Sequence, residues 1–187
     1  MTNTAPPADT APPAPAPAVA DASDRSALRV QHVAWDDPRA VAMRARMDVE
    51  MNERYTDPGV VEHPSVTAAR DAALRVDPER VHATVLVTDD SGRAVAHAAL
   101  RDLDGEWEVK RVIVDATERG RGLGGLLMAE LESIARAGGA RRLILQTGDR
   151  QPEAVRLYER VGYRPIPTYE PYVDALPNSI CFEKPLA

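Results

Sequence analysis

The sequence has few cysteines, few lysines and no long apolar run. Its 187 residues include one cysteine, Cys181, which excludes an intramolecular disulfide framework and a zinc site built from cysteines. No apolar stretch approaches the roughly 18–20 residues that a membrane-spanning helix needs, so we expect no membrane partner. The chain also lacks an excess of positive charge, because its 23 basic residues are outnumbered by 29 acidic ones and the net charge is −6. A chain with this balance is not expected to bind nucleic acid.

The four histidines give no sign of a metal site. His32, His63, His82 and His97 fall in different predicted elements, without the short spacings that bring metal ligands together. We therefore expect no metal cofactor.

The first residues differ in composition from the rest of the chain. Residues 1–24 hold six of the 16 prolines and eight alanines, without a lysine or an arginine. Repeated Ala-Pro steps favour an extended chain that buries nothing. We expect residues 1–25 to be a disordered arm and residues 26–187 to form one domain. The arm lacks the basic and apolar regions of a secretory signal, so we expect a cytoplasmic protein.

Hydrophobic periodicity predicts an α/β (α+β) domain in which a mixed sheet carries helices on its faces. The longest predicted strand, at 106–115, alternates so that Trp107, Val109, Arg111 and Ile113 share one face. The predicted strands are 26–34, 82–88, 94–101, 106–115, 142–147, 163–165 and 179–184, and the predicted helices are 38–54, 67–75, 123–137 and 152–161.

The most informative segment is the glycine loop, residues 119–125, with the sequence Arg-Gly-Arg-Gly-Leu-Gly-Gly. It follows a predicted strand and opens a predicted helix. Backbone N–H groups converge at a helix N-terminus, where the helix dipole favours an anion and glycine lets a phosphate approach. The loop therefore predicts a pyrophosphate site, with Arg119 and Arg121 as cationic donors at its rim.

The glycine loop fits two sequence patterns. Gly120, Gly122 and Gly125 match the G-x-G-x-x-G fingerprint of dinucleotide-binding domains, with Asp149 at a suitable distance downstream. Against this interpretation, an antiparallel meander precedes the loop and only one further helix follows it. The second pattern, Arg-x-x-Gly-x-Gly, starts at Arg119.

Three segments carry a resemblance to a known family. Residues 108–114 (Glu-Val-Lys-Arg-Val-Ile-Val), 119–124 and 154–163 resemble the GNAT superfamily of acetyl-CoA-dependent N-acetyltransferases. The resemblance implies a mixed, mostly antiparallel sheet of six or seven strands, splayed between strands 4 and 5 and flanked by about four helices. It also implies acetyl-CoA as co-substrate and an amine acceptor, small molecule or peptide. Members of this family are often homodimers.

The resemblance further implies which residues bind the cofactor. Backbone groups of the splayed strand would hydrogen-bond the pantetheine, and the glycine loop would hold the pyrophosphate. Gln151 stands where the family usually has an asparagine that contacts the cofactor. The implied cofactor-binding residues are Val112, Ile113, Val114, Arg119, Gly120, Arg121, Gly122, Leu123, Gly124, Gly125 and Gln151.

Two residues match the family's catalytic positions. Tyr158 would stand near the cofactor sulfur, and its phenol would protonate the departing thiolate. Glu108 would act as general base on the acceptor ammonium if burial raised its pKa. Two other functions remain open at this point: a catalytically silent acyl-CoA sensor on the same fold, and an NAD(P)-binding domain.

The acceptor end is expected between the first two helices and the last hairpin. Acidic residues between positions 48 and 62 would attract a cationic amine, and residues 169–172 (Tyr-Glu-Pro-Tyr) would line the substrate. The acidic residues are Asp48, Glu50, Glu53, Asp57 and Glu62.

Overall fold

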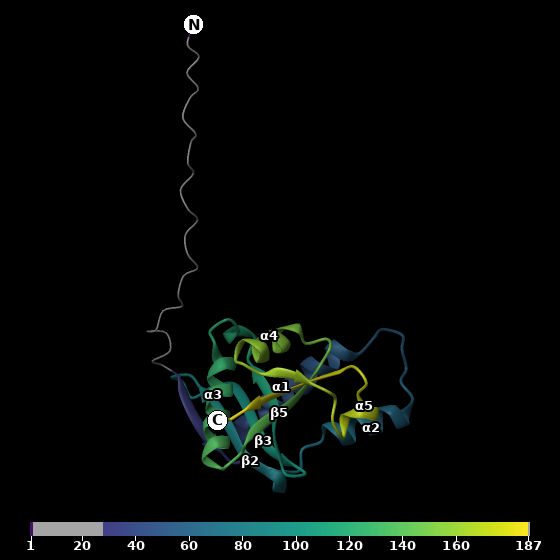
Figure 1. Ribbon diagram of the computed structural model, residues 1–187, viewed down its shortest axis with the longest axis horizontal. Helices are drawn as coiled ribbons and strands as arrows, with labels where there is room; N and C mark the ends of the chain where they lie inside the picture. The colour runs from purple at the N-terminus through teal and green to yellow at the C-terminus, as the bar shows by residue number, and fades with distance from the viewer. Residues whose placement is uncertain (2–27, 187) are drawn as a thin grey trace.

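A seven-stranded sheet with helices on both faces makes up the computed structural model (Figure 1). The structure describes Met1 and residues 28–186. The predicted disordered arm, Met1 apart, therefore lies outside the described residues. Among those that are described, no helix is both long and apolar enough to cross a bilayer.

The strand order across the sheet is β1-β2-β3-β4-β5-β7-β6. All neighbouring strands run antiparallel except β4 and β5, which are parallel. The mixed, mostly antiparallel sheet is thus confirmed, and a doubly wound dinucleotide-binding sheet, which would be largely parallel, is wrong. The strands are β1 Arg29–Val33, β2 Val81–Thr88, β3 Ala94–Leu103, β4 Glu106–Val114, β5 Arg142–Gly148, β6 Arg164–Ile166 and β7 Ser179–Pro185.

Three of the four predicted helices begin at the expected residue and end within one of the expected end. The predicted helix 67–75 is wrong at its start: it begins at Pro64, because proline suits the first helical position and the His63 side chain accepts from the Ser65 N–H. A fifth, short helix was not predicted. The helices are α1 Pro38–Tyr55, α2 Pro64–Leu74, α3 Leu123–Ala137, α4 Pro152–Arg160 and α5 Tyr172–Ala175, with 3-10 turns at Pro78–Arg80 and Ala116–Glu118.

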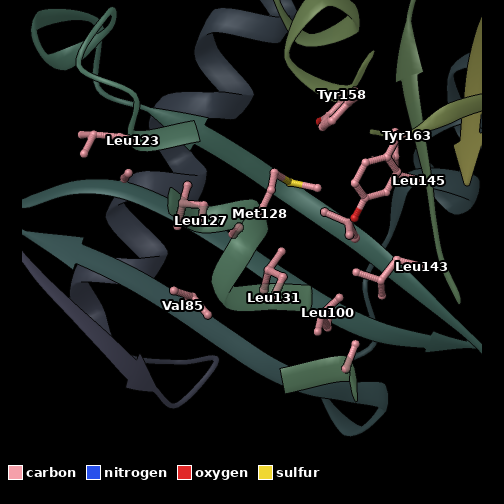
Figure 2. Close-up of a cluster of buried hydrophobic side chains, with 14 of the residues drawn as sticks. Val85, Leu100, Leu123, Leu127, Met128, Leu131, Leu143, Leu145, Tyr158 and Tyr163 are labelled. Carbon is pink, nitrogen blue, oxygen red and sulfur yellow. The ribbon is translucent and has the colours of Figure 1, made fainter. Parts of the chain in front are cut away.

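A hydrophobic core cluster lies between the sheet and α3 (Figure 2). Leu123, Leu127 and Leu131 recur every fourth residue, so they share one helix face, and all are buried against Val85 and Leu100 of the sheet. The opposite face carries α1, which contacts β3 and β4. The sheet is therefore buried on both sides at its centre.

A β-bulge interrupts β4. The register between β3 and β4 shifts by one residue between His97 and Ala99, and Arg111 has a φ of +58°. The buried His97 fixes the bulge, because its Nδ1 donates to the Arg111 carbonyl oxygen at 2.8 Å. A bulge of this kind inserts one extra residue and reverses the alternation of side chains beyond it.

The predicted face of β4 is therefore only partly right. Before the bulge, Trp107 and Val109 pack on the α3 side, together as expected. Beyond the bulge, Val112 and Val114 pack against that cluster, and the buried Ile113 does not. Alternation alone cannot reveal an inserted residue.

The parallel strands β4 and β5 separate soon after they meet. Within the described chain they pair over three positions, from Trp107 with Leu143 to Val109 with Leu145. Beyond these positions, 110–114 and 146–148 diverge and line a cleft. The splay between the fourth and fifth strands is thus present.

Candidate active site

A cleft of about 1820 Å³ opens where β4 and β5 separate. One wall is built from the two splayed strands, the glycine loop, the first turn of α3 and one side of α4. The facing wall comes from α1, α2 and residues 60–62, and residues 175–179 close it beside β7. The cleft therefore joins the predicted phosphate site to the predicted acceptor end.

The structure brings almost all of the predicted cofactor-binding residues to this cleft. Arg121 is the exception: it does not line the cleft itself, although its side chain pairs with Glu118, which does. The predicted residues that line the cleft are Val112, Ile113, Val114, Arg119, Gly120, Gly122, Leu123, Gly124, Gly125 and Gln151.

The glycine loop ends in a helix N-terminus without a side-chain cap. Gly122 is the N-cap residue of α3 and adopts a φ of +80°, a conformation that glycine takes without strain. Because Gly122 has no side chain, the N–H groups of the first turn of α3 lack both an intrahelical and a side-chain acceptor. Such groups, at the wall of a cleft, suit an anion.

Gly124 serves packing as well. A Cβ at this position would lie 2.8 Å from a methyl carbon of Leu157 on α4, so a larger residue would require the Leu157 side chain to shift. Gly125 differs, because a Cβ there would meet no atom within 4 Å. Packing against Leu157 thus explains why residue 124 is glycine, and packing does not explain why residue 125 is glycine.

Both arginines of the loop are held by carboxylates. Arg119 Nη2 lies 2.5 Å from Glu50 Oε2 on α1, and its Nε donates to the Val114 carbonyl oxygen at 3.2 Å. Arg121 pairs with Glu118, which also accepts from Arg93. An anion bound at the loop would therefore share or displace the Arg119–Glu50 pair.

Gln151 lies at the start of α4 and reaches across the cleft to α1. Its Nε2 donates to the Tyr55 hydroxyl at 3.4 Å, and the same hydroxyl accepts from the Arg150 N–H at 3.1 Å. A Cβ at Gly148 would lie 1.9 Å from that hydroxyl, so any other residue there would displace the Tyr55 side chain from this position. Sequence reasoning missed Tyr55 and Gly148.

Tyr158 lines the cleft from α4 and is otherwise buried, with 6% of its surface exposed. Its ring packs against that of Tyr163, at a centroid distance of 6.1 Å (Figure 2). The ring of Phe182 lies on it as well, at 5.9 Å. Burial raises the pKa of the Tyr158 phenol well above its usual range, so the hydroxyl keeps its proton at neutral pH. A neutral phenol at the cleft wall can donate a hydrogen bond or a proton.

Glu108 lies behind the cleft wall and is completely buried. Arg101 Nε donates to one carboxylate oxygen at 2.6 Å, and the hydroxyls of Tyr169 and Tyr172 donate to the other at 2.9 and 2.7 Å. Both oxygens are thus occupied. In this position Glu108 meets no molecule in the cleft directly, so the predicted role as base requires an intermediate group.

Lys110 is the part of this buried network that reaches the cleft. It follows Glu108 by two residues on β4, and its Nζ donates to the Tyr172 hydroxyl at 2.8 Å. Desolvation lowers the pKa of Lys110 to about 8. Sequence reasoning missed this residue, although a spacing of two on a strand is the signal for a shared face.

The predicted acidic rim is largely neutralised by arginines, which corrects the expectation of an attractive negative field. The pairs that line or border the cleft are Asp48 with Arg111, Glu50 with Arg54 and Arg119, Asp57 with Arg150, and Glu62 with Arg70. The residues expected to line the substrate also lie elsewhere. Tyr169 and Tyr172 point into the Glu108 network, and residues 175–179 line the cleft instead.

The chain matches the sequence profile of the Acetyltransferase (GNAT) family over residues 44–163. It is 38% identical over 103 residues to an IAA acetyltransferase of Azospirillum brasilense, across 54% of this chain and 67% of the relative. It is 34% identical over 90 residues to YjcF, an uncharacterized N-acetyltransferase of Bacillus subtilis, across 48% of this chain and 61% of the relative.

Solved structures share the architecture. A Klebsiella pneumoniae protein, provisionally named an acyl-CoA N-acyltransferase, matches with a TM-score of 0.67 and 30% identity over 86% of this chain and 98% of its own. A GNAT acetyltransferase of Elizabethkingia anophelis with bound acetyl-CoA matches in fold, with a TM-score of 0.58 and 15% identity over 86% and 99%. Because the family profile spans more than half of the sequence, this chain belongs to the GNAT acetyltransferase family.

Proposed function

We propose that this protein transfers the acetyl group of acetyl-CoA to a primary amine by direct attack in a ternary complex. The observation that carries the proposal is a single cleft that runs from an uncapped helix N-terminus, through splayed strands, to a buried phenol. The two ends of the cleft suit a phosphate and an acceptor, and Tyr158 lies along it. The acetyl-CoA bound in the Elizabethkingia relative supports the choice of donor.

The residues of the phosphate end fit acetyl-CoA. The first-turn N–H groups of α3 would bind the pyrophosphate, with Arg119 as cationic donor after it leaves or shares Glu50. Backbone groups of 112–114 are available to the pantetheine because β5 has turned away from them. When bound, the cofactor supplies an acetyl group already activated as a thioester.

Tyr158 would supply the proton that the leaving thiolate needs. The acceptor nitrogen forms a bond to the acetyl carbon, the carbon–sulfur bond breaks, and the thiolate takes the phenolic proton. The nitrogen, now bound to the acetyl carbon, loses its extra proton, which returns through water to the Tyr158 phenolate. The raised pKa keeps the phenol protonated until that moment, because burial disfavours its anion.

A thermal-shift comparison with acetyl-CoA, longer acyl-CoAs and NAD(P) tests the cofactor. We expect stabilisation by acetyl-CoA and none by NAD(P), since only a ligand that binds the folded state raises the melting temperature. A panel of amines assayed for thiol release then tests transfer. Binding of acetyl-CoA without thiol release from any amine would replace this proposal with an acyl-CoA sensor.

A further inference from the structure

The cleft wall of β4 carries a lysine where the buried glutamate cannot reach. Glu108 and Lys110 share one face of the strand. Lys110 lines the cleft, whereas Glu108 is fully buried behind it. Lys110 is itself only 6% exposed, and its residue lines the cleft while its Nζ reaches back to Tyr172. An acceptor bound in the cleft would therefore lie closer to Lys110 than to Glu108.

The hydrogen bonds of the Tyr172 hydroxyl show that Lys110 donates to it and accepts nothing from it. The Tyr172 hydroxyl gives its only hydrogen to Glu108, at 2.7 Å, and its oxygen accepts from Arg101 at 2.9 Å and from Lys110 at 2.8 Å. Tyr172 therefore has no hydrogen to offer to Lys110. When Lys110 is neutral, its lone pair is left unused by Tyr172 and remains available to a molecule in the cleft.

Burial is the main cause that favours the neutral amine of Lys110, and the neighbouring charges act in both directions: Glu108 raises the pKa of Lys110, whereas Arg101 and Arg111 lower it. The network contains two cations and one anion, and Glu108 is already paired with Arg101. The Arg111 guanidinium on the same strand adds to the positive potential, although it is paired with Asp48. The other titratable groups that face Lys110 are neutral: Tyr172 of α5 and Cys181 of β7.

We propose that Lys110 is the proton acceptor for the acceptor ammonium, with Tyr172 and Glu108 orienting it. This inference rests on the proposed acetyl transfer. The ammonium gives one proton to Lys110 Nζ, and the freed lone pair attacks the acetyl carbon. The carbon–nitrogen bond forms, the carbon–sulfur bond breaks, and the thiolate is protonated by Tyr158. The amide nitrogen loses its second proton, which returns through water to the Tyr158 phenolate, and Lys110 gives its own proton to water after the products leave.

Two acceptors of different basicity test the role. Benzylamine is an ammonium ion at neutral pH and must lose a proton, whereas aniline is already uncharged. We expect Lys110→Met to lower kcat/KM for benzylamine by about 100-fold and to change that for aniline by less than about threefold. The wild-type rate with benzylamine should also rise with pH through a midpoint near the lysine pKa of about 8, and the variant should lose that limb.

The variant should fold, because methionine keeps most of the lysine stem and removes a buried charge. Its thermal shift with acetyl-CoA serves as the control. An equal loss with both amines, or no loss with benzylamine, would overturn the role of Lys110 while leaving acetyl transfer intact. Absence of thiol release by the wild-type protein with every amine would instead overturn the proposed function.

A direct titration gives a readout that needs no turnover. The chain has two lysines, Lys110 and Lys184, so lysine labelled with carbon-13 at Cε yields two assignable signals. Lys184, which donates to Glu132 at 2.7 Å outside the cleft, is the internal reference. We expect the Lys110 signal to titrate near pH 8 and to vanish in Lys110→Met. Titration of Lys110 at the ordinary lysine value would contradict the inference.

Discussion

Arg119 of the glycine loop and Glu50 of α1 form an ion pair, with Nη2 and Oε2 2.5 Å apart. The pair joins the phosphate end of the cleft to the helix that forms its facing wall. Glu50 also accepts from Arg54, which in turn pairs with Glu153 of α4. A bound pyrophosphate would compete with Glu50 for the same guanidinium.

This competition predicts opposite effects of two substitutions. Arg119→Ala should weaken acetyl-CoA binding by about tenfold, because a charge-assisted hydrogen bond is lost. Glu50→Gln should strengthen binding by about twofold to threefold, since the competing carboxylate is removed from a partly exposed pair whose own strength is small. Isothermal titration calorimetry measures both. Unchanged affinity in Arg119→Ala would exclude Arg119 from the phosphate site.

The two adjacent glycines of α3 form a matched pair. Gly124→Ala should destabilise the protein by about 1–3 kcal/mol, because the new Cβ overlaps Leu157. Gly125→Ala should raise the free energy of unfolding by about 0.5–1 kcal/mol, because alanine favours a helix and its Cβ meets no atom.

Urea unfolding gives both changes in stability, and calorimetry gives the affinity for acetyl-CoA. If the open space beside Gly125 is where the phosphate binds, the stabilised Gly125→Ala protein should bind acetyl-CoA less tightly. Equal destabilisation by the two alanines would contradict the packing argument.

Substitutions at the neighbouring Tyr158 and Tyr163 distinguish a catalytic hydroxyl from one that only packs in the core. Tyr158→Phe should lower kcat by about 10–100-fold with unchanged acetyl-CoA affinity, because it removes the proposed proton donor and keeps the ring. Tyr163→Phe is the control, since the Tyr163 hydroxyl is buried without a hydrogen-bond partner in the structure. Its removal should leave kcat unchanged and raise stability by about 1 kcal/mol. Steady-state thiol release measures kcat, and urea unfolding measures the stability of both variants. Full activity in Tyr158→Phe would exclude Tyr158 as the proton donor.

His97 predicts how stability depends on pH. Its Nδ1 donates to the carbonyl oxygen of Arg111, and its Nε2 lies 3.3 Å from the Arg44 guanidinium, so the ring must be neutral to accept there. Burial lowers the pKa of His97 to about 4. The unfolded chain therefore binds a proton at higher pH than the folded one, and stability contributed by neutral His97 is lost as the pH falls from about 6.5 to about 4.

The loss attributable to His97 should be about 2–3 kcal/mol over that interval. In His97→Gln the corresponding decline should be smaller by that amount, because glutamine can donate to the same carbonyl and does not titrate. Urea unfolding of both proteins at pH 7 and pH 4.5 gives the comparison. Parallel declines would assign the pH dependence to carboxylates elsewhere.

Local signals were enough to predict most of the elements and the phosphate end of the site. The leucines of α3 recur at helical spacing, Pro38 and Pro152 open α1 and α4, and the glycine loop identifies a helix N-terminus. These signals depend on the covalent chain within a few residues. The start of α2 was missed because a histidine is an unusual N-cap.

The roles of the charged residues could not be predicted in the same way. Glu108 matches a catalytic position in the sequence, but the fold surrounds it with Arg101 and two tyrosines from a distant loop. The acidic residues between positions 48 and 57 suggest an attractive rim in the sequence, but arginines more than 60 residues away pair with Asp48, Glu50 and Asp57. Such pairings are set by tertiary contacts, which leave no periodic trace in the sequence.

The sequence by itself determined the family, the sheet-and-helix order and the glycine loop, because helix periodicity, turn residues and glycine spacing act locally. Only the tertiary structure decided which side chains face the cleft. One inserted residue at Arg111 reverses the alternation of β4, and packing behind the strand hides Glu108 and leaves Lys110 at the surface of the site. Burial and register depend on neighbours that are far away in sequence, and that dependence fixes the chemistry available in the cleft.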